Sequence, residues 1–189
     1  MNKLKIFAMI LWLTMLMSFI NLAMAQTFVP LDKAPHDIVY FKSDGNVKPQ
    51  IKVVYGRPLA DNNEIFGKDI PYGKIWRTGA NEATEIKFYQ DVMFANKFIK
   101  AGTYTLFTIP GENYWTVILN SNTDSLGAFF YDESKDLARI QVPSNEADPT
   151  QVFTIAFNSR NYGAQLVLAW GVTTVKVPVY LEQGLLSNV

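Results

Sequence analysis

Most of the chain alternates apolar and polar residues with a period of two, and this pattern constrains the fold more than any other feature. The clearest runs are 51–55, 115–119 and 153–157. Such alternation places successive side chains on opposite faces of a β-strand. Turn residues separate the runs at intervals of roughly 8–12 residues, and no helical period is evident beyond residue 25. The sequence therefore predicts an all-β fold, a single antiparallel β-sandwich of jelly-roll-like type.

Three finer predictions concern single segments. The apolar run 128–131 is predicted as a strand, and 143–150, which is rich in turn residues, as a loop. Pro178 interrupts the last alternating run. Because proline has no backbone N–H to donate, it marks that run as an edge strand.

The N-terminus has the three parts of a secretory signal peptide. Lys3 and Lys5 precede an apolar run at 6–20, and Ala23-Met24-Ala25 supplies small residues at a cleavage site. We expect cleavage after Ala25, which leaves Gln26 first. A retained N-terminal membrane anchor is the alternative.

These boundaries give an expected domain organisation of signal peptide at 1–25, an irregular segment at 26–37 and one β-sandwich domain at 38–189. The cleaved protein is expected to be exported, to the periplasm or beyond the cell, without membrane insertion.

Charge and composition exclude several classes of function. Removing Lys3 and Lys5 from 17 Lys and Arg leaves 15 against 17 Asp and Glu, a side-chain charge of −2. Such a balance creates no field that would attract nucleic acid, so no nucleic-acid partner is expected. The absence of cysteine rules out disulfides, thiolate catalysis and thiolate zinc sites.

No cofactor and no metal site is expected either. The chain has one histidine, His36, whereas zinc hydrolases take two or three, and it has no phosphate-binding glycine motif. His36 is interpreted as a capping or surface residue. The run 120–124 alternates oxygen-bearing side chains like a calcium loop, but it lacks the glycine and closing glutamate of an EF-hand. An asparagine-rich turn is the better interpretation.

A catalytic role would have to rest on carboxylates. Paired carboxylates support glycoside hydrolysis, and Glu82, Asp132 and Asp136 are the candidates by chemistry alone. The alternative function is therefore a carboxylate-based hydrolase acting on an envelope glycan.

The densest group of special residues lies at 70–84, inside the longest irregular region, 59–83. An indole, a guanidinium, an amide and a carboxylate occur there within a few residues, and a second arginine comes from the neighbouring turn. The candidate site residues are Arg57, Trp76, Arg77, Asn81 and Glu82.

Two interpretations of this group remain open. In the structural one, Arg77 and Glu82 pair across the Gly79 turn and hold the 59–83 loop to the sheet. In the functional one, an arginine faces a cleft and binds a small polar or anionic ligand or a glycan. Long loops on a rigid sheet often carry function.

Several motifs follow one another in an order that resembles domain-of-unknown-function family 2911, over roughly residues 38–179. They are Tyr55-Gly56-Arg57-Pro58, Ile65-Phe66-Gly67, Pro71-Tyr72-Gly73-Lys74-Ile75-Trp76-Arg77-Thr78-Gly79-Ala80-Asn81-Glu82-Ala83-Thr84, Ala101-Gly102-Thr103-Tyr104, Phe107-Thr108-Ile109-Pro110-Gly111, Trp115-Thr116-Val117 and Tyr131-Asp132.

The resemblance implies an exported protein of Gram-negative bacteria and carries no activity or catalytic residue. The chain also departs from the family pattern. Asp61-Asn62-Asn63-Glu64 replaces a basic segment, and Leu126-Gly127 replaces Trp-Gly. A ligand site that used those basic groups or that tryptophan is weakened here. The resulting prediction is an exported ligand-binding or envelope-interaction module with its site in the 55–84 region.

Overall fold

The computed structural model describes residues 2–20, 32–43, 45, 47–60 and 64–181, with side chains described outside 15–20. The chain divides into two units, Met1–Leu31 and Asp32–Val189. The described residues of the first unit form the helix α1 (Lys3–Ile20). The expected cleavage site at Ala25 lies outside the described residues. Across the described ranges, no helix is both long and apolar enough to cross a membrane.

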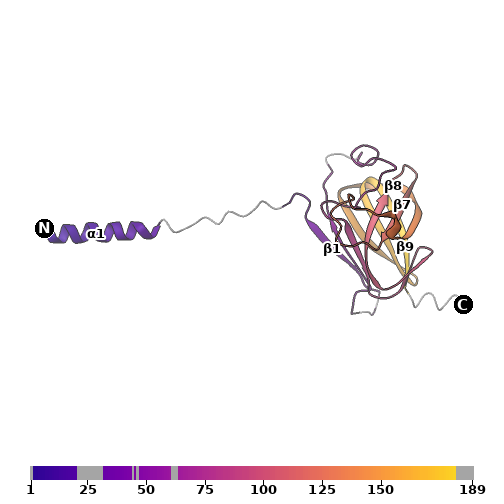
Figure 1. Cartoon of the computed structure of the whole chain (residues 1–189), viewed down its shortest axis with the longest axis horizontal. Helices are drawn as coiled ribbons and strands as arrows, with labels where there is room; N and C mark the ends of the chain where they lie inside the picture. Colours follow the sequence, from indigo (N-terminus) through magenta and orange to yellow (C-terminus); the bar gives the residue numbers. More distant parts are fainter. Residues whose placement is uncertain (1, 21–31, 44, 46, 61–63, 182–189) are drawn as a thin grey trace. The chain divides into compact units, whose positions relative to one another are not determined.

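The second unit is built of strands, which confirms the all-β prediction (Figure 1). Its elements are β1 (His36–Phe41), β2 (Ile51–Gly56), β3 (Thr84–Phe88), β4 (Val92–Phe94), β5 (Lys97–Ile99), β6 (Gly102–Ile109), β7 (Tyr114–Asn120), the 3₁₀ turn η1 (Glu133–Lys135), β8 (Asp136–Arg160) and β9 (Gly163–Leu181).

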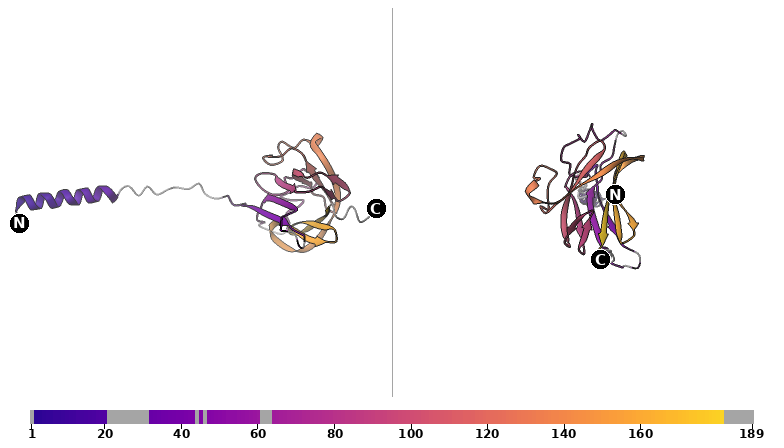
Figure 2. Two further views of the ribbon diagram at one scale, coloured as in Figure 1. Left: turned by 90° about the horizontal axis from the view of Figure 1, so that it is seen from below. Right: turned by 90° about the vertical axis from the view of Figure 1, so that its right-hand side faces the viewer.

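All strand pairs are antiparallel and form one continuous sheet in the order β1-β2-β3-β6-β7-β8-β9-β4-β5. The sheet folds over itself, so the architecture is sandwich-like, with two layers facing each other (Figure 2). β8 belongs to both layers. Up to Pro143 it pairs with β7, and from Ser144 onward it pairs with β9.

The long strand β8 corrects the predicted loop at 143–150. Pro149 and Asp148 lie where the β8–β9 pairing is irregular, with register shifts between Glu146 and Thr150 and between Thr150 and Thr154. Turn-type residues therefore mark a bend in a strand here rather than the end of one.

β9 also differs from its prediction. It lies between β8 and β4, so Pro178 does not mark an edge strand, and the Pro178 carbonyl accepts the N–H of Ala95 at 2.8 Å.

β9 reverses direction on itself, because the N–H of Leu181 donates to Tyr162 O, next to the start of the same strand, at 2.9 Å. Nineteen extended residues would separate these ends by roughly 60 Å. Gly171, with φ +58°, lies midway along β9 and has the left-handed backbone conformation that allows the chain to reverse there.

The segment 128–131, predicted as a strand, is a turn. Gly127 has φ +70°, and the Tyr131 N–H donates to Ala128 O at 3.3 Å. Phe129 is 88% exposed, so the apolar run is not a buried strand.

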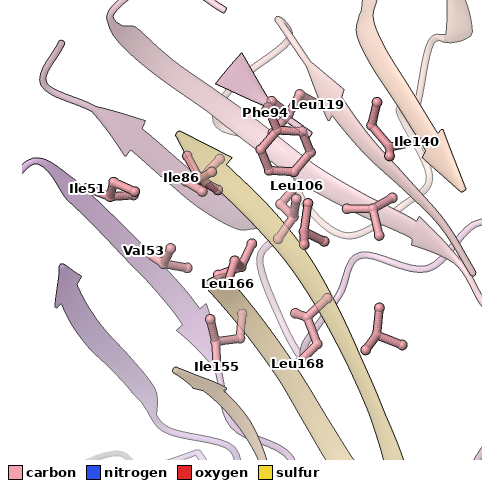
Figure 3. Packing of buried hydrophobic residues seen from close by; sticks show 14 of the residues in the cluster. Ile51, Val53, Ile86, Phe94, Leu106, Leu119, Ile140, Ile155, Leu166 and Leu168 are labelled. Atoms are coloured by element: carbon pink, nitrogen blue, oxygen red, sulfur yellow. The ribbon is translucent and has the colours of Figure 1, made fainter. Parts of the chain in front are cut away.

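The core lies between the two layers, where inward residues of β2 and β3 meet those of β8 and β9 (Figure 3). Ile51, Val53 and Leu166 are completely buried. An aromatic group lies beside these aliphatic residues, and its members are Tyr55, Phe66, Trp76, Trp115, Phe153 and Trp170.

Candidate functional site

The loop after Trp76 is fixed against the end of β2 by backbone contact. A Cβ at Gly56 would lie 2.1 Å from Ala80 O, and one at Gly79 would lie 2.9 Å from Gly56 O. Only glycine permits this approach at both positions. Thr78 is buried with φ +57°, and its carbonyl accepts the Thr84 hydroxyl at 2.7 Å. A β-branched residue in the left-handed region is strained, so the surrounding contacts must hold it there.

Arg77 and Glu82 do not pair, which corrects the structural prediction for this loop. Arg77 Nη1 donates to the Asn81 carbonyl oxygen at 3.2 Å. Glu82 instead lies near His36, with 3.7 Å between its Oε2 and His36 Nε2. The chain turns at Asn81, where φ is +62°, so the two side chains leave the loop in different directions.

Arg57 holds the start of β1, and Asn81 holds the segment before it. Arg57 Nη1 donates to Asp37 Oδ2 at 3.0 Å, while Asn81 Nδ2 donates to Ala34 O at 3.1 Å. Hydrogen bonds from the Ala34 N–H and the Asn81 side chain hold the pKa of Asp32 below its usual value. Both candidate residues are thus engaged in contacts within the protein.

Trp76 is a core residue. It is 6% exposed and stacks on Trp170, with ring centroids 6.0 Å apart at 14°. Its backbone exchanges two hydrogen bonds with Thr108, at 2.7 and 2.9 Å. These contacts insert the loop into the centre of the domain and leave little of the indole for a ligand.

A pocket of about 190 Å³ opens beside this loop, and we call it the acidic pocket. It contains three carboxylates, one imidazole and one hydroxyl. The lining residues are His36, Val54, Glu82, Ala83, Glu85, Asp124, Ser125 and Leu126. Ser125 is 6% exposed, and its Oγ is buried without a hydrogen-bond partner. A buried hydroxyl without a partner is costly, so Ser125 is an unused polar group at this pocket.

One wall of the acidic pocket is the 121–131 loop. The Ala83 N–H donates to Ser125 O at 2.9 Å and joins the loop to the start of β3. From β6, Thr105 Oγ1 donates to the loop at Asn122 O, at 2.6 Å. The wall is therefore fastened to both β3 and β6.

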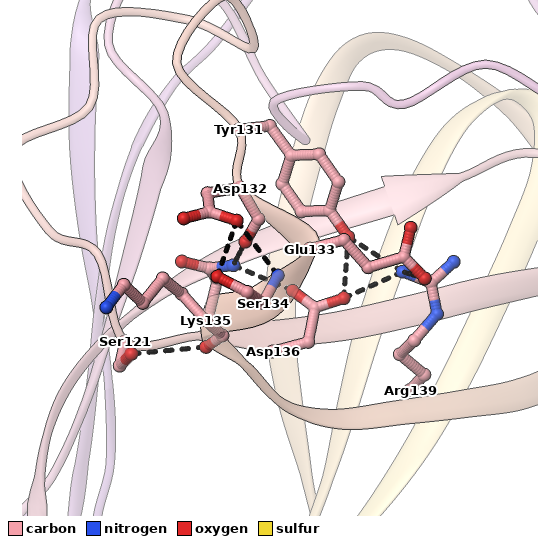
Figure 4. A network of polar contacts seen from close by, with 9 residues as sticks. Ser121, Tyr131, Asp132, Glu133, Ser134, Lys135, Asp136 and Arg139 are labelled. Carbon is pink, nitrogen blue, oxygen red and sulfur yellow. Dashed lines mark hydrogen bonds and ion pairs between the residues drawn. The ribbon is translucent and has the colours of Figure 1, made fainter.

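A polar network fixes the far end of this loop (Figure 4). Asp136 Oδ2 accepts from Tyr131 Oη at 2.6 Å and from Arg139 Nη1 at 2.7 Å, and Asp136 Oδ1 accepts from Asn120 Nδ2 at 2.7 Å. Burial, together with the hydrogen bond and charge of Asp136, raises the pKa of Tyr131 above its usual range. The phenol therefore remains a donor at neutral pH.

This network also uses the carboxylates proposed for hydrolysis. Both oxygens of Asp136 are occupied, and its side chain is 5% exposed. Asp132 Oδ1 accepts the N–H of Ser134 at 2.9 Å and its hydroxyl at 2.7 Å, which lowers the pKa of Asp132. Of the three carboxylates, Glu82 is the one that lines the acidic pocket.

A second hollow, of about 250 Å³, involves another part of the 121–131 loop. It is lined by Ile75, Trp76, Arg77, Ala128 and Phe129. The Arg77 guanidinium lies against Gly127, 2.9 Å from the place that a Cβ would take. The five candidates from the sequence are therefore not gathered at one site: Glu82 lines the acidic pocket, Trp76 and Arg77 line this hollow, and Arg57 and Asn81 line neither.

Four polar residues of the acidic pocket were missed as site residues: His36, Glu85, Asp124 and Ser125. In the sequence, Glu85 stands at an outward position of an alternating run, and only this position could have indicated that its side chain is not buried. Asp124 and Ser125 become neighbours of β3 only through the fold. Among the residues that the structure describes, no three His, Asp or Glu side chains lie close enough together to hold a metal ion.

Comparison with known proteins gives one match. No curated protein and no solved structure matches the chain. Residues 37–179, from β1 into β9, match a family model described as Protein of unknown function (DUF2911). The match covers both the central 70–84 stretch and the loop that forms the wall of the acidic pocket, so the chain belongs to the family DUF2911.

Proposed function

We propose that the protein is an exported ligand-binding module and that its acidic pocket receives the positively charged group of a small ligand. The observation that carries the proposal is the convergence of Glu82, Glu85 and Asp124 on one pocket beside the partnerless Ser125 hydroxyl. An ammonium group has three donors and no acceptor, so it matches a pocket lined by acceptors. Ligand sites are commonly clefts with a few convergent polar groups.

The sequence-based hypothesis expected a polar or anionic ligand or a glycan, whereas the structure favours a positively charged one. Arg57 faces Asp37, and Arg77 is bonded to the Asn81 carbonyl, so neither arginine lies in the acidic pocket. A cation or an amine is therefore favoured there over an anion.

Hydrolysis of an envelope glycan is less well supported. A general acid needs a carboxyl group whose pKa is raised by an apolar environment. Glu82 is 72% exposed, and Asp132 and Asp136 are used in internal hydrogen bonds. Binding without chemistry remains the better-supported function.

The binding proposal predicts that the purified protein binds hexylamine and that neutralising the pocket weakens binding. Glu85→Gln and Asp124→Asn should each raise the Kd by about tenfold, equivalent to about 1.4 kcal/mol, because each removes one attractive charge. Isothermal titration calorimetry at low ionic strength measures the effect, since salt screens exposed charges.

Glu112→Gln is the matched control for this experiment. It makes the same change in net charge at an exposed position outside the pocket. If the control raises the Kd as much as the pocket variants do, the attraction comes from overall charge. Absence of hexylamine binding to the unaltered protein contradicts the proposal.

Export itself is a further prediction. The basic start, apolar run and Ala23-Met24-Ala25 support cleavage after Ala25, and delivery to the periplasm or the exterior. Intact-mass measurement of the protein recovered from the envelope fraction should give a chain that begins at Gln26. A mass that includes residues 1–25 would mean a retained anchor.

A further inference from the structure

The outer face of the sheet next to the acidic pocket carries two lysines that face each other across neighbouring strands. Lys52 of β2 lies directly opposite Lys87 of β3 in the strand register. Like charges directly opposite each other destabilise a sheet. Among the described residues, no carboxylate forms an ion pair with either lysine. The Lys87 ammonium lies 4.9 Å from the centre of the Tyr89 ring, which orients it without neutralising it.

The lysine pair lines a hollow of its own, with a volume of about 190 Å³. Its lining residues are Lys52, Val54, Glu85, Lys87 and Thr103. Thr103 lies opposite Lys87 in the register, on the side of Lys87 away from Lys52. Two ammonium groups and a hydroxyl thus offer donors from three adjacent strands.

This hollow adjoins the acidic pocket, because Val54 and Glu85 line both. Val54 and Glu85 are register partners one step along the strands from Lys52 and Lys87. Side chains on one face of a strand repeat every two residues, so neighbouring steps are roughly 7 Å apart. The result is one groove that is positive at the Lys52–Lys87 end and negative at the Glu82–Asp124 end.

We propose that this groove binds a small zwitterion, with its ammonium in the acidic pocket and its carboxylate between Lys52 and Lys87. The inference rests on the proposed function and adds a second subsite and the ligand class. Val54 supplies an apolar floor between the two ends. Glu85 faces the middle of the groove and repels a carboxylate from the acidic end, which sets the orientation of the ligand.

The spacing selects the length of the ligand. The lysine pair and Glu85 are separated by one step along the strands, roughly 7 Å. Glu82 and Asp124 lie beyond Glu85, in the acidic pocket. An extended peptide advances about 3.3–3.6 Å per residue. The free termini of a di- or tripeptide are therefore far enough apart to reach both ends of the groove, and a short free peptide is the ligand class that fits.

Three six-carbon probes test the proposal: 6-aminohexanoate, hexylamine and hexanoate. They share one alkyl chain and differ only in their charged ends. The Kd of 6-aminohexanoate should be at least about tenfold lower than that of hexylamine or hexanoate, because only the zwitterion fills both subsites. Glycine, whose charges are adjacent, should show no such gain.

The double variant Lys52→Gln/Lys87→Gln should raise the Kd of 6-aminohexanoate by about tenfold but should not raise the Kd of hexylamine, because removing two positive charges cannot weaken the binding of a cation. Lys97→Gln/Lys100→Gln, which changes two exposed lysines outside the groove, is the matched control. Removing a like-charge pair should not lower the melting temperature, so the groove variant is expected to remain folded.

The outcomes separate the two proposals. If hexylamine binds but 6-aminohexanoate binds no more tightly, or if the groove variant binds the zwitterion as well as the control does, the lysine subsite is wrong and the acidic pocket stands. If neither hexylamine nor 6-aminohexanoate binds, both proposals fall.

Discussion

Trp76→Ala is expected to lower the free energy of unfolding by about 3–5 kcal/mol, the usual cost of truncating a buried tryptophan. The indole is 6% exposed and contacts Phe66, Trp115, Phe153 and Trp170. Its removal leaves a cavity among rigid rings that cannot close it, and the lost contacts and the cavity both add to the cost. Denaturant unfolding followed by intrinsic fluorescence measures the loss.

Phe129→Ala is the control for this prediction, because Phe129 is also aromatic but 88% exposed. It should change the free energy of unfolding by less than about 0.5 kcal/mol. If Trp76→Ala proved equally mild, the indole would not be part of the core. A ligand-binding role for Trp76 would then have to be reconsidered.

Gly56→Ala is expected to destabilise the protein by roughly 3 kcal/mol, at the upper end of what an added methyl group costs in a packed site. The new Cβ would lie 2.1 Å from Ala80 O and 2.8 Å from Ala80 C, so the backbone of the loop must move. That loop holds Trp76 in the core and carries Glu82 to the acidic pocket. Gly56→Ala should therefore also weaken hexylamine binding.

Gly102→Ala is the matched control. A Cβ at Gly102 would meet Tyr104 Oη at 3.0 Å, and this flexible side-chain end can move aside, whereas backbone at Gly56 cannot. Its cost should stay below about 1 kcal/mol. Equal unfolding free energies for Gly56→Ala and Gly102→Ala would show that the loop yields easily and is not fixed by the Gly56 contact.

The strands were predictable because alternation is a local property. β2 and β7 lie where the period-2 runs indicated, since one face of each had to be buried. Trp76 could be singled out for a similar reason, because an indole in a long polar loop needs a packing partner. Its role in the core, rather than at a ligand, depends on Trp170, a residue far along the chain.

The candidate site could not be predicted in the same way. Spacing suggested that Arg77 and Glu82 meet across Gly79, but the positive φ of Thr78 and Asn81 directs Glu82 toward His36. A pattern of residue types does not specify such dihedral angles. Likewise, Lys52 and Lys87 become neighbours only through the register of β2 with β3, which is set by which faces are buried and by the connections between strands.

The passage of β8 from one layer to the other has a consequence for how the domain comes apart. Its first part completes the sheet beside β7, and its second part forms the sheet with β9. Because β8 belongs to both layers, neither layer can separate without breaking hydrogen bonds of a strand that is also part of the other layer. Unfolding is therefore expected to be cooperative and all-or-none, as in most single domains of this size. The groove on one layer should then lose its shape in the same transition that exposes the buried face of the other.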